Sequence, residues 1–149
     1  MIKKIVFLLT FATLLFSNSF ELNKNINNFS LVDQFDKVHT VNSDVKTILV
    51  SFEKGTGADV NQFLSSKNPD FLQNNHAVFI ANISDMPSII TKMFALPKMK
   101  KYKHSILLIY DESDKRFLQE EEKTTVYKLE NGVIKNISYI EKKDLEKVF

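Results

Sequence analysis

Three short runs of consecutive apolar residues constrain the fold of this chain more than any other feature. They are residues 47–52, 76–83 and 105–111, and each is rich in Ile, Val, Leu or Phe. Runs of this length without alternation are typical of strands that are covered on both faces. The segments between them carry helix-starting residues, and strands that alternate with helices imply parallel βαβ connections.

The helix signals between these runs set the expected helix boundaries. Asp59 is a candidate N-cap for a helix through Ser66, and Pro69 is expected at the first position of a second helix. Ser84 or Asp85 is expected to cap a third helix, with Pro87 near its first position, that runs to Leu96, where Pro97 interrupts it. Met93 and Met99 lie at helical spacing with Leu96, which is typical of core residues.

Turn signals at both ends of the chain predict antiparallel strands. Asn131-Gly132 separates residues 124–129 from residues 133–140, which predicts a two-residue type I′ hairpin. Near the N-terminus, residues 29–32 and 38–41 flank a polar turn. With a last helix over residues 141–149, the expectation is an α/β fold: a mixed central sheet flanked by helices, with an N-terminal β-hairpin.

The N-terminus has the pattern of a secretory signal peptide. Lys3 and Lys4 precede an apolar stretch over residues 5–16, and Ser17-Asn18-Ser19 supplies small residues for cleavage before Phe20. We expect residues 1–19 to be the signal, residues 20–28 to be a loose polar lead-in and residues 29–149 to be one domain, located in the periplasm. An uncleaved membrane anchor remains the alternative, although the stretch is short for a spanning helix.

The charge of the domain argues against nucleic-acid binding. The whole chain has 20 basic and 18 acidic residues, and removal of Lys3 and Lys4 leaves 18 of each sign. A nucleic-acid partner generally requires a clear basic excess. The expected partner is therefore a periplasmic protein or peptide, with membrane contact only through an uncleaved signal segment.

The chain contains no cysteine, and this absence excludes a large class of chemistry. Thiol–disulfide exchange and peroxide reduction by cysteine both need a thiolate nucleophile. In an oxidising compartment the domain must also be stable through packing alone, since it has no disulfide.

Four local patterns resemble the thioredoxin-like superfamily, in its peroxiredoxin-like branch. They are an F-x-L-x-D opening at residues 29–33, a central strand at residues 48–52, a T-T-x-x-x-L hairpin at residues 124–134 and a last helix starting at residues 141–145. The added strand at residues 105–111, followed by an acidic segment, is similar to the exported YtfJ-type subgroup. The resemblance covers residues 29–149 and implies a thioredoxin-like fold.

The resemblance also implies that the redox centre has been dismantled. The positions of the family's redox-active cysteines fall near Gly57 and Val60, and the cis-proline beside them falls on Lys123. No thiol chemistry can follow, and we assign no catalytic residue, metal ligand or cofactor.

The candidate functional surface is the segment that replaces this redox loop. We expect Lys54, Gly55, Thr56, Gly57 and Asp59 to form a ligand site before a helix, because backbone N–H groups there favour anions and glycine permits close approach. A phosphate, a carboxylate or a peptide terminus would suit such a site. The same residues also suit an ordinary strand-to-helix turn, and ligands of such sheets bind at strand C-terminal ends.

Two further hypotheses remain open from the sequence. His104 and Asp111 are candidates for a cysteine-free metal carrier or enzyme site. Lys98, Lys100, Lys101 and Lys103 form the densest basic patch, which suits anionic lipid headgroups, an acidic partner or simply a solvated helix end.

Overall fold

The structure of the protein is a computed structural model, which describes residues 19–149. Apart from Ser19, the predicted signal peptide lies outside the described residues, so its existence stays a prediction. Within the described part, no helix is long and apolar enough to cross a membrane.

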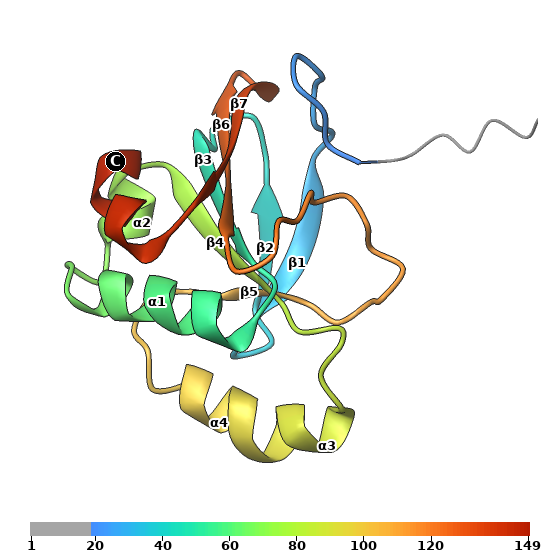
Figure 1. The fold of residues 1–149 in the computed structure, drawn as a ribbon, viewed down its shortest axis with the longest axis vertical. Coiled ribbons are helices and arrows are strands. Elements are labelled where there is room, and N and C mark those ends of the chain that lie inside the picture. Colours follow the sequence, from blue (N-terminus) through green and yellow to red (C-terminus); the bar gives the residue numbers. More distant parts are fainter. Residues whose placement is uncertain (1–18) are drawn as a thin grey trace, which may run out of the picture.

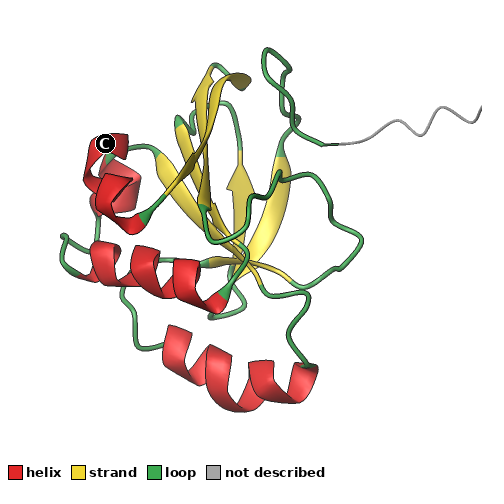
Figure 2. Cartoon of the chain, in the orientation of Figure 1, coloured by secondary structure: helices red, strands yellow, loops and turns green. Residues whose placement is uncertain are grey.

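A seven-stranded mixed sheet forms the centre of the molecule (Figure 2). The strands are β1 (Phe29–Asp33), β2 (Val38–Val41), β3 (Thr47–Ser51), β4 (Ala77–Asn82), β5 (Leu107–Ile109), β6 (Thr124–Glu130) and β7 (Val133–Ile140). Their order is β2-β1-β5-β4-β3-β6-β7, in which β3, β4 and β5 are parallel and all other neighbours are antiparallel. The expected α/β fold with a mixed sheet and flanking helices is confirmed.

The helices lie on one side of this sheet and below it in Figure 1. They are α1 (Lys54–Ser65), α2 (Phe71–Asn74), α3 (Ser88–Ile90), the π-helical turn η1 (Thr91–Ala95), α4 (Leu96–Met99) and the C-terminal 3₁₀-helix η2 (Lys142–Val148). α1, α2 and η2 cover one face of the sheet, whereas the continuous helix from α3 to α4 lies outside α1 at the edge of the molecule.

Two hydrophobic cores lie on the two faces of the sheet, and alternation along β3 separates them. Leu49 packs into the core under the helices, and Ile48 and Val50 pack into the core on the opposite face. That second core is closed by loops: Phe20 and Phe117 meet there in an edge-to-face contact. The residues of both cores that the structure describes run from Phe20 to Val148.

The segment before β1 is tied down, contrary to the expected loose lead-in at residues 20–28. The Ile26 side chain is buried in the second core. The backbone N–H groups of Asn23 and Ile26 donate to the carbonyls of Ile134 and Gly132, at 2.8 Å in each case. The polar composition of this segment gave no sign of the anchoring, because the backbone and the apolar side chains of Phe20 and Ile26 make these contacts.

The β6–β7 hairpin matches its prediction closely. Glu130 pairs with Val133, which leaves Asn131 and Gly132 as a two-residue turn. Their φ angles of 50° and 80° are both positive, as a type I′ turn requires. The predicted last helix is present as the 3₁₀-helix η2, and its Leu145 is fully buried against the core.

The first helix starts earlier than predicted, at Lys54 instead of Asp59. Glu53 is in an extended conformation, and the Gly57 N–H already donates to the Glu53 carbonyl at 3.0 Å. Two glycines in the first turns argued against a helix there, since glycine disfavours helices. Packing outweighs this preference, because Val60 and Leu64 bury the inner face of α1.

The predicted starts of the second and third helices also need correction. Pro69 lies in the turn before α2, which begins only at Phe71. Pro87, and not Ser84 or Asp85, is the residue that precedes α3. Pro69 therefore lies outside α2, whereas Pro87 lies next to the first residue of α3, close to its predicted place.

Pro97 does not end the third helix, which continues to Met99. The turn before it is π-helical: the Leu96 N–H donates to the Thr91 carbonyl, five residues back. Proline normally clashes with the carbonyl four residues before it, and a wider turn is a known way to accommodate such irregularities. The sequence offers no signal for a π turn, so the continuation was missed.

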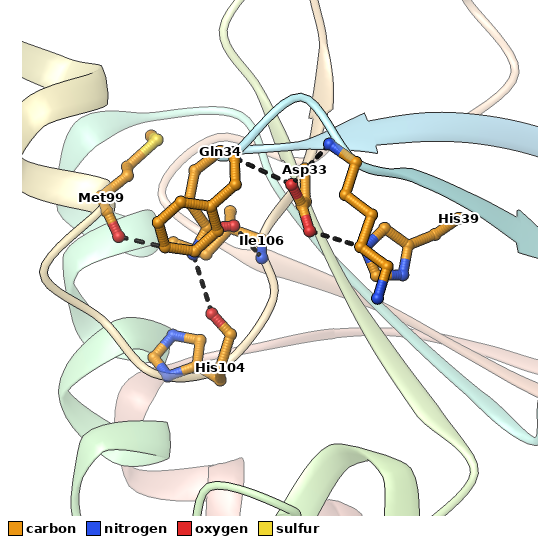
Figure 3. Close-up of polar contacts among 8 residues, drawn as sticks. Asp33, Gln34, His39, Met99, His104 and Ile106 are labelled. Atoms are coloured by element: carbon orange, nitrogen blue, oxygen red, sulfur yellow. Dashed lines mark hydrogen bonds and ion pairs between the residues drawn. The ribbon is translucent and has the colours of Figure 1, made fainter.

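One buried glutamine joins the turn after β1 to the chain segment that follows α4 (Figure 3). The Gln34 side chain is 1% exposed. Its Nε2 donates to the His104 carbonyl at 2.9 Å and to the Met99 carbonyl at 3.4 Å, and its Oε1 accepts from the Ile106 N–H at 2.8 Å. A single side chain therefore satisfies three backbone groups of this connection.

The neighbouring Asp33 organises the β1–β2 turn itself. Its carboxylate accepts the backbone N–H groups of Phe35 and Lys37 and lies 2.6 Å from His39 Nε2 (Figure 3). Burial opposes ionisation of this carboxylate, but the hydrogen bonds from His39, Phe35 and Lys37 outweigh it and hold the pKa of Asp33 below its ordinary value. The turn that presents Gln34 is thus fixed from both sides.

Replacement of Gln34 by methionine should destabilise the protein strongly. The variant keeps the side-chain length but leaves the His104 carbonyl and the Ile106 N–H without their partner, which we expect to lower the free energy of unfolding by about 2–4 kcal/mol. Urea unfolding followed by circular dichroism measures this loss. The exposed Gln73→Met is the matched control, expected within about 0.5 kcal/mol of wild type, and a similar small effect for Gln34→Met would contradict the assignment.

Candidate functional site

An apolar groove of about 280 Å³ lies at the C-terminal ends of β3 and β4. The start of α1 forms one wall, and the helix from α3 to α4 forms the other. Ser51 and Ala81, at or near the ends of the two strands, lie between these walls. This edge is where ligands of open α/β sheets generally bind.

The lining of the groove is mainly apolar and includes several polar groups. Its large apolar side chains are Phe52, Ile83, Met86, Ile90, Phe94, Met99 and Tyr102. Asn61 and Asn82 add amide groups, and charged residues of both signs, such as Glu53 and Lys98, also contribute. An apolar hollow with a few polar groups is the usual character of a binding pocket.

The structure separates the five residues predicted to form the ligand site. Lys54 and Gly57 line the groove. Thr56 is buried, and its hydroxyl donates to the Glu53 carbonyl at 3.1 Å, so it stabilises the helix start. Asp59 lies on another side of α1, with its carboxylate 3.9 Å from Lys142 Nζ, and Gly55 is exposed outside the groove lining.

Gly57 brings α1 close to the end of β3. A Cβ atom at this position would lie 3.3 Å from Ser51 Oγ, which is tighter than an ordinary contact. Val60, the other position where the resemblance places a cysteine, is fully buried in the core under the helices. One of the two positions therefore faces the groove and the other serves packing.

The last two residues of the loop before β6 contact the start of α1 and the residue before η2. The Glu53 carboxylate accepts the Glu122 backbone N–H at 2.9 Å. Lys123, where the resemblance places a cis-proline, forms an ion pair of 2.7 Å with Glu141. This contact raises the pKa of Lys123 and lowers that of Glu141. Residues 19–149 contain no cis peptide bond.

His104 and Asp111 do not form a common site, because they lie beyond opposite ends of β5. His104 Nε2 is 2.8 Å from the Asn61 side-chain oxygen, and burial lowers the pKa of His104 to about 4. Asp111 instead accepts the backbone N–H and hydroxyl of Ser113, which lower its pKa. Among the residues that the structure describes, no group of three or more His, Asp or Glu side chains could hold a metal ion.

Several groove residues were not found from the sequence. Ile90 and Phe94 are 41% and 63% exposed, and their spacing resembled that of an ordinary buried helix face. The core interpretation of Met93 was wrong, since this side chain is 61% exposed, whereas Met99 does pack against the core. A helix of this composition gives no sequence signal for which of its apolar residues face the protein.

Comparison with known proteins supports the fold and leaves the family open. Neither a family model nor a curated protein matches the chain. Among solved structures, it is similar to the peroxidoxin BcpB from Mycobacterium tuberculosis, at a TM-score of 0.54 and 10% identity over 87% of this chain and 94% of the other. The fold is thioredoxin-like, in a variant without cysteine.

Two further structures show the same fold. The thioredoxin domain of the thiol-disulfide oxidoreductase BVU-2223 from Bacteroides vulgatus matches at a TM-score of 0.53 and 14% identity, over 87% of this chain and 95% of the other. A peroxiredoxin-like protein from Aquifex aeolicus matches at a TM-score of 0.51 and 8% identity, over 88% and 89%. At these identities the likeness concerns the fold alone.

Burial of neutral His104 predicts a pH dependence of stability. Its pKa is about 4 in the folded protein against 6.5 for an ordinary histidine, so between these values the unfolded chain binds a proton that the folded protein does not. The free energy of unfolding should therefore fall as the pH is lowered from 6.5 to 4, by on the order of 2–3 kcal/mol. Urea unfolding across this range measures the effect.

The control for this prediction uses two histidine variants. His104→Gln keeps an amide donor for Asn61 but cannot be protonated, so its stability should vary little over the same pH range. His76→Asn replaces an exposed histidine at a positive φ angle, which asparagine tolerates, and should leave the dependence intact. If the free energy of unfolding of His104→Gln falls with pH as steeply as that of wild type, another group causes the pH dependence.

Proposed function

We propose that this protein is an exported, cysteine-free binding module that captures an apolar segment of a protein or peptide in the groove between α1 and α3–α4. We also propose that the protein belongs to the YtfJ-type subgroup of the peroxiredoxin-like branch and that it is located in the periplasm. The observation that carries it is the groove itself, which occupies the place where the resemblance puts the redox site.

The character of the groove supports an apolar peptide side chain over a small anion. Phe52, Ile90 and Phe94 provide mainly hydrocarbon surface, and burial of such surface favours association by about 25 cal/mol per Å². The Glu53 carboxylate stands at the start of α1, where an anion bound to the helix N-terminus would meet its charge. The amide oxygens of Asn61 and Asn82 are bonded to His104 and Ser84, which leaves their NH₂ groups as donors for a peptide carbonyl.

Binding to peptides is tested by filling the groove from an exposed helix position. Ala58 lines the groove and is exposed, so Ala58→Trp should occupy the hollow without disturbing the core. We expect residues 19–149 to bind members of an immobilised random peptide library that carry a large apolar residue. The variant should bind the same peptides at least about tenfold more weakly.

A matched control places the same side chain elsewhere. Gln73→Trp adds an exposed tryptophan on α2, outside the groove lining, and should bind peptides like wild type. Equal binding by wild type and Ala58→Trp, or no peptide bound above background by either, would refute the proposed groove.

Export is tested separately on the full chain. When the chain is produced in a Gram-negative host, we expect it in the periplasmic fraction with Phe20 as its first residue, as determined by mass spectrometry. Phe20 donates its N–H to the Arg116 carbonyl at 2.7 Å, a bond that a new terminal amino group can still make. Retention in the cytoplasm with an intact N-terminus would refute export, and a membrane-bound intact chain would favour the anchor.

A further inference from the structure

The segment of residues 88–103, which contains α3, η1 and α4, exposes an unusual amount of apolar surface. Ile89, Ile90, Met93 and Phe94 are 62%, 41%, 61% and 63% exposed. They lie at helix positions i, i+1, i+4 and i+5, so they share one face of the helix. Exposed apolar residues that gather in this way mark an interaction surface, whereas isolated ones do not.

The same segment carries a concentration of positive charge. Its lysines are Lys92, Lys98, Lys100, Lys101 and Lys103, and no acidic residue stands between Asp85 and Asp111. All five lysines are exposed. No ion pair of the described residues involves any of them.

This concentration makes the domain electrically polar although it is neutral as a whole. Residues 20–149 contain 18 basic and 18 acidic residues, so the segment carries +5 and the remainder 13 basic and 18 acidic residues, or −5. Figure 1 shows α3–α4 at the outer edge of the molecule, beyond α1. An anionic surface would therefore attract this edge and repel the rest of the domain.

We infer that the segment of residues 88–103 docks on an anionic lipid bilayer surface. Ile89, Met93 and Phe94 would enter the boundary between headgroups and acyl chains, while the lysines would contact the headgroups. A basic helix with exposed Ile, Met and Phe side chains has the composition of interfacial membrane helices. No described helix is able to span a bilayer, so the contact is made at the surface.

A bilayer fits this surface better than an acidic protein does. Ile89 and Met93 do not line the groove, so they project from the helix without a concave frame around them. A protein partner would need a matching hollow, whereas a bilayer accepts projecting side chains of any outline. The inference goes beyond the peptide site and does not depend on it, although Ile90 and Phe94 also line the groove.

Vesicle binding tests this inference directly on residues 19–149, which contain both cores. The leader is omitted because its apolar stretch would itself bind lipid. We expect the domain to sediment with vesicles of phosphatidylglycerol and phosphatidylcholine and to stay in solution with phosphatidylcholine alone. Cooperative unfolding of each variant, followed by circular dichroism, verifies that it is folded.

Two double variants separate the charge from the apolar face. Lys100→Glu with Lys101→Glu should weaken binding to the anionic vesicles at least about tenfold. Lys46→Glu with Lys135→Glu makes the same change in net charge at exposed positions outside the segment and should cause a much smaller loss. Equal losses of vesicle binding in the two double variants would show that only net charge matters. They would contradict docking through residues 88–103.

The apolar face is tested by Ile89→Asp with Met93→Asp, which should abolish vesicle binding. This variant should still bind peptides, because neither residue lines the groove, so failure of the two proposals is distinguishable. Leu22→Asp with Val38→Asp replaces exposed apolar residues elsewhere and should leave vesicle binding intact. Retained binding by Ile89→Asp with Met93→Asp would show that the side chains do not insert, and would overturn the inference.

The absence of tryptophan from the chain allows a direct measure of insertion. Met93→Trp introduces a single fluorophore on the docking face, whose emission should shift to shorter wavelength with anionic vesicles and be quenched by brominated lipids. Gln73→Trp on α2 should show neither change. No shift for Met93→Trp, or the same shift with neutral vesicles, would contradict docking by this face on anionic lipid.

Discussion

The hydrogen bonds of Gln34 fix the part of the molecule on which the candidate site depends. This side chain joins the β1–β2 turn to the connection between α4 and β5 through the carbonyls of Met99 and His104 and the N–H of Ile106. A buried amide that satisfies three backbone groups is costly to disrupt, because each would otherwise lose its partner away from water. The hydrogen bonds of Gln34 therefore fix the position at which α4 ends.

The position of α4 decides whether the groove exists. Its wall from Met86 to Tyr102 touches the rest of the protein through partly buried apolar residues, among which Leu96 and Met99 pack against the helix-side core. The opposite wall, α1, can approach β3 closely because Gly57 has no Cβ atom, which would lie 3.3 Å from Ser51 Oγ. The groove thus depends on two local features: the hydrogen bonds of Gln34 and the absence of a side chain at Gly57.

The sequence predicted the sheet well, because the apolar runs that indicate strands are the same residues that the sheet buries on both faces. The buried runs became β3, β4 and β5, and Asn131-Gly132 became the expected turn. Helix starts were predicted poorly. Glu53 and Pro87 begin helices through backbone conformation, and packing of Val60 overrides the glycines before it. Local propensity contains neither effect.

The candidate site was predicted only in part, because a sequence does not show which side of a helix meets the protein. Lys54 and Gly57 were placed on the right segment, but Thr56 turns inward and Asp59 faces Lys142. The exposure of Phe94 could not be predicted, since an exposed phenylalanine has the same helical spacing as a buried one.

The anchoring of residues 20–28 has a consequence for the order in which the chain can fold. These residues are synthesised long before Gly132 and Ile134, to which they bond. Contacts of such long sequence separation form late, so the core around Phe20, Phe117 and Tyr127 stays open until the hairpin exists. The helix-covered core includes Val126 and Leu145, so it too stays incomplete until β6 and η2 have been synthesised. The nascent domain therefore offers a chaperone both apolar faces of its sheet.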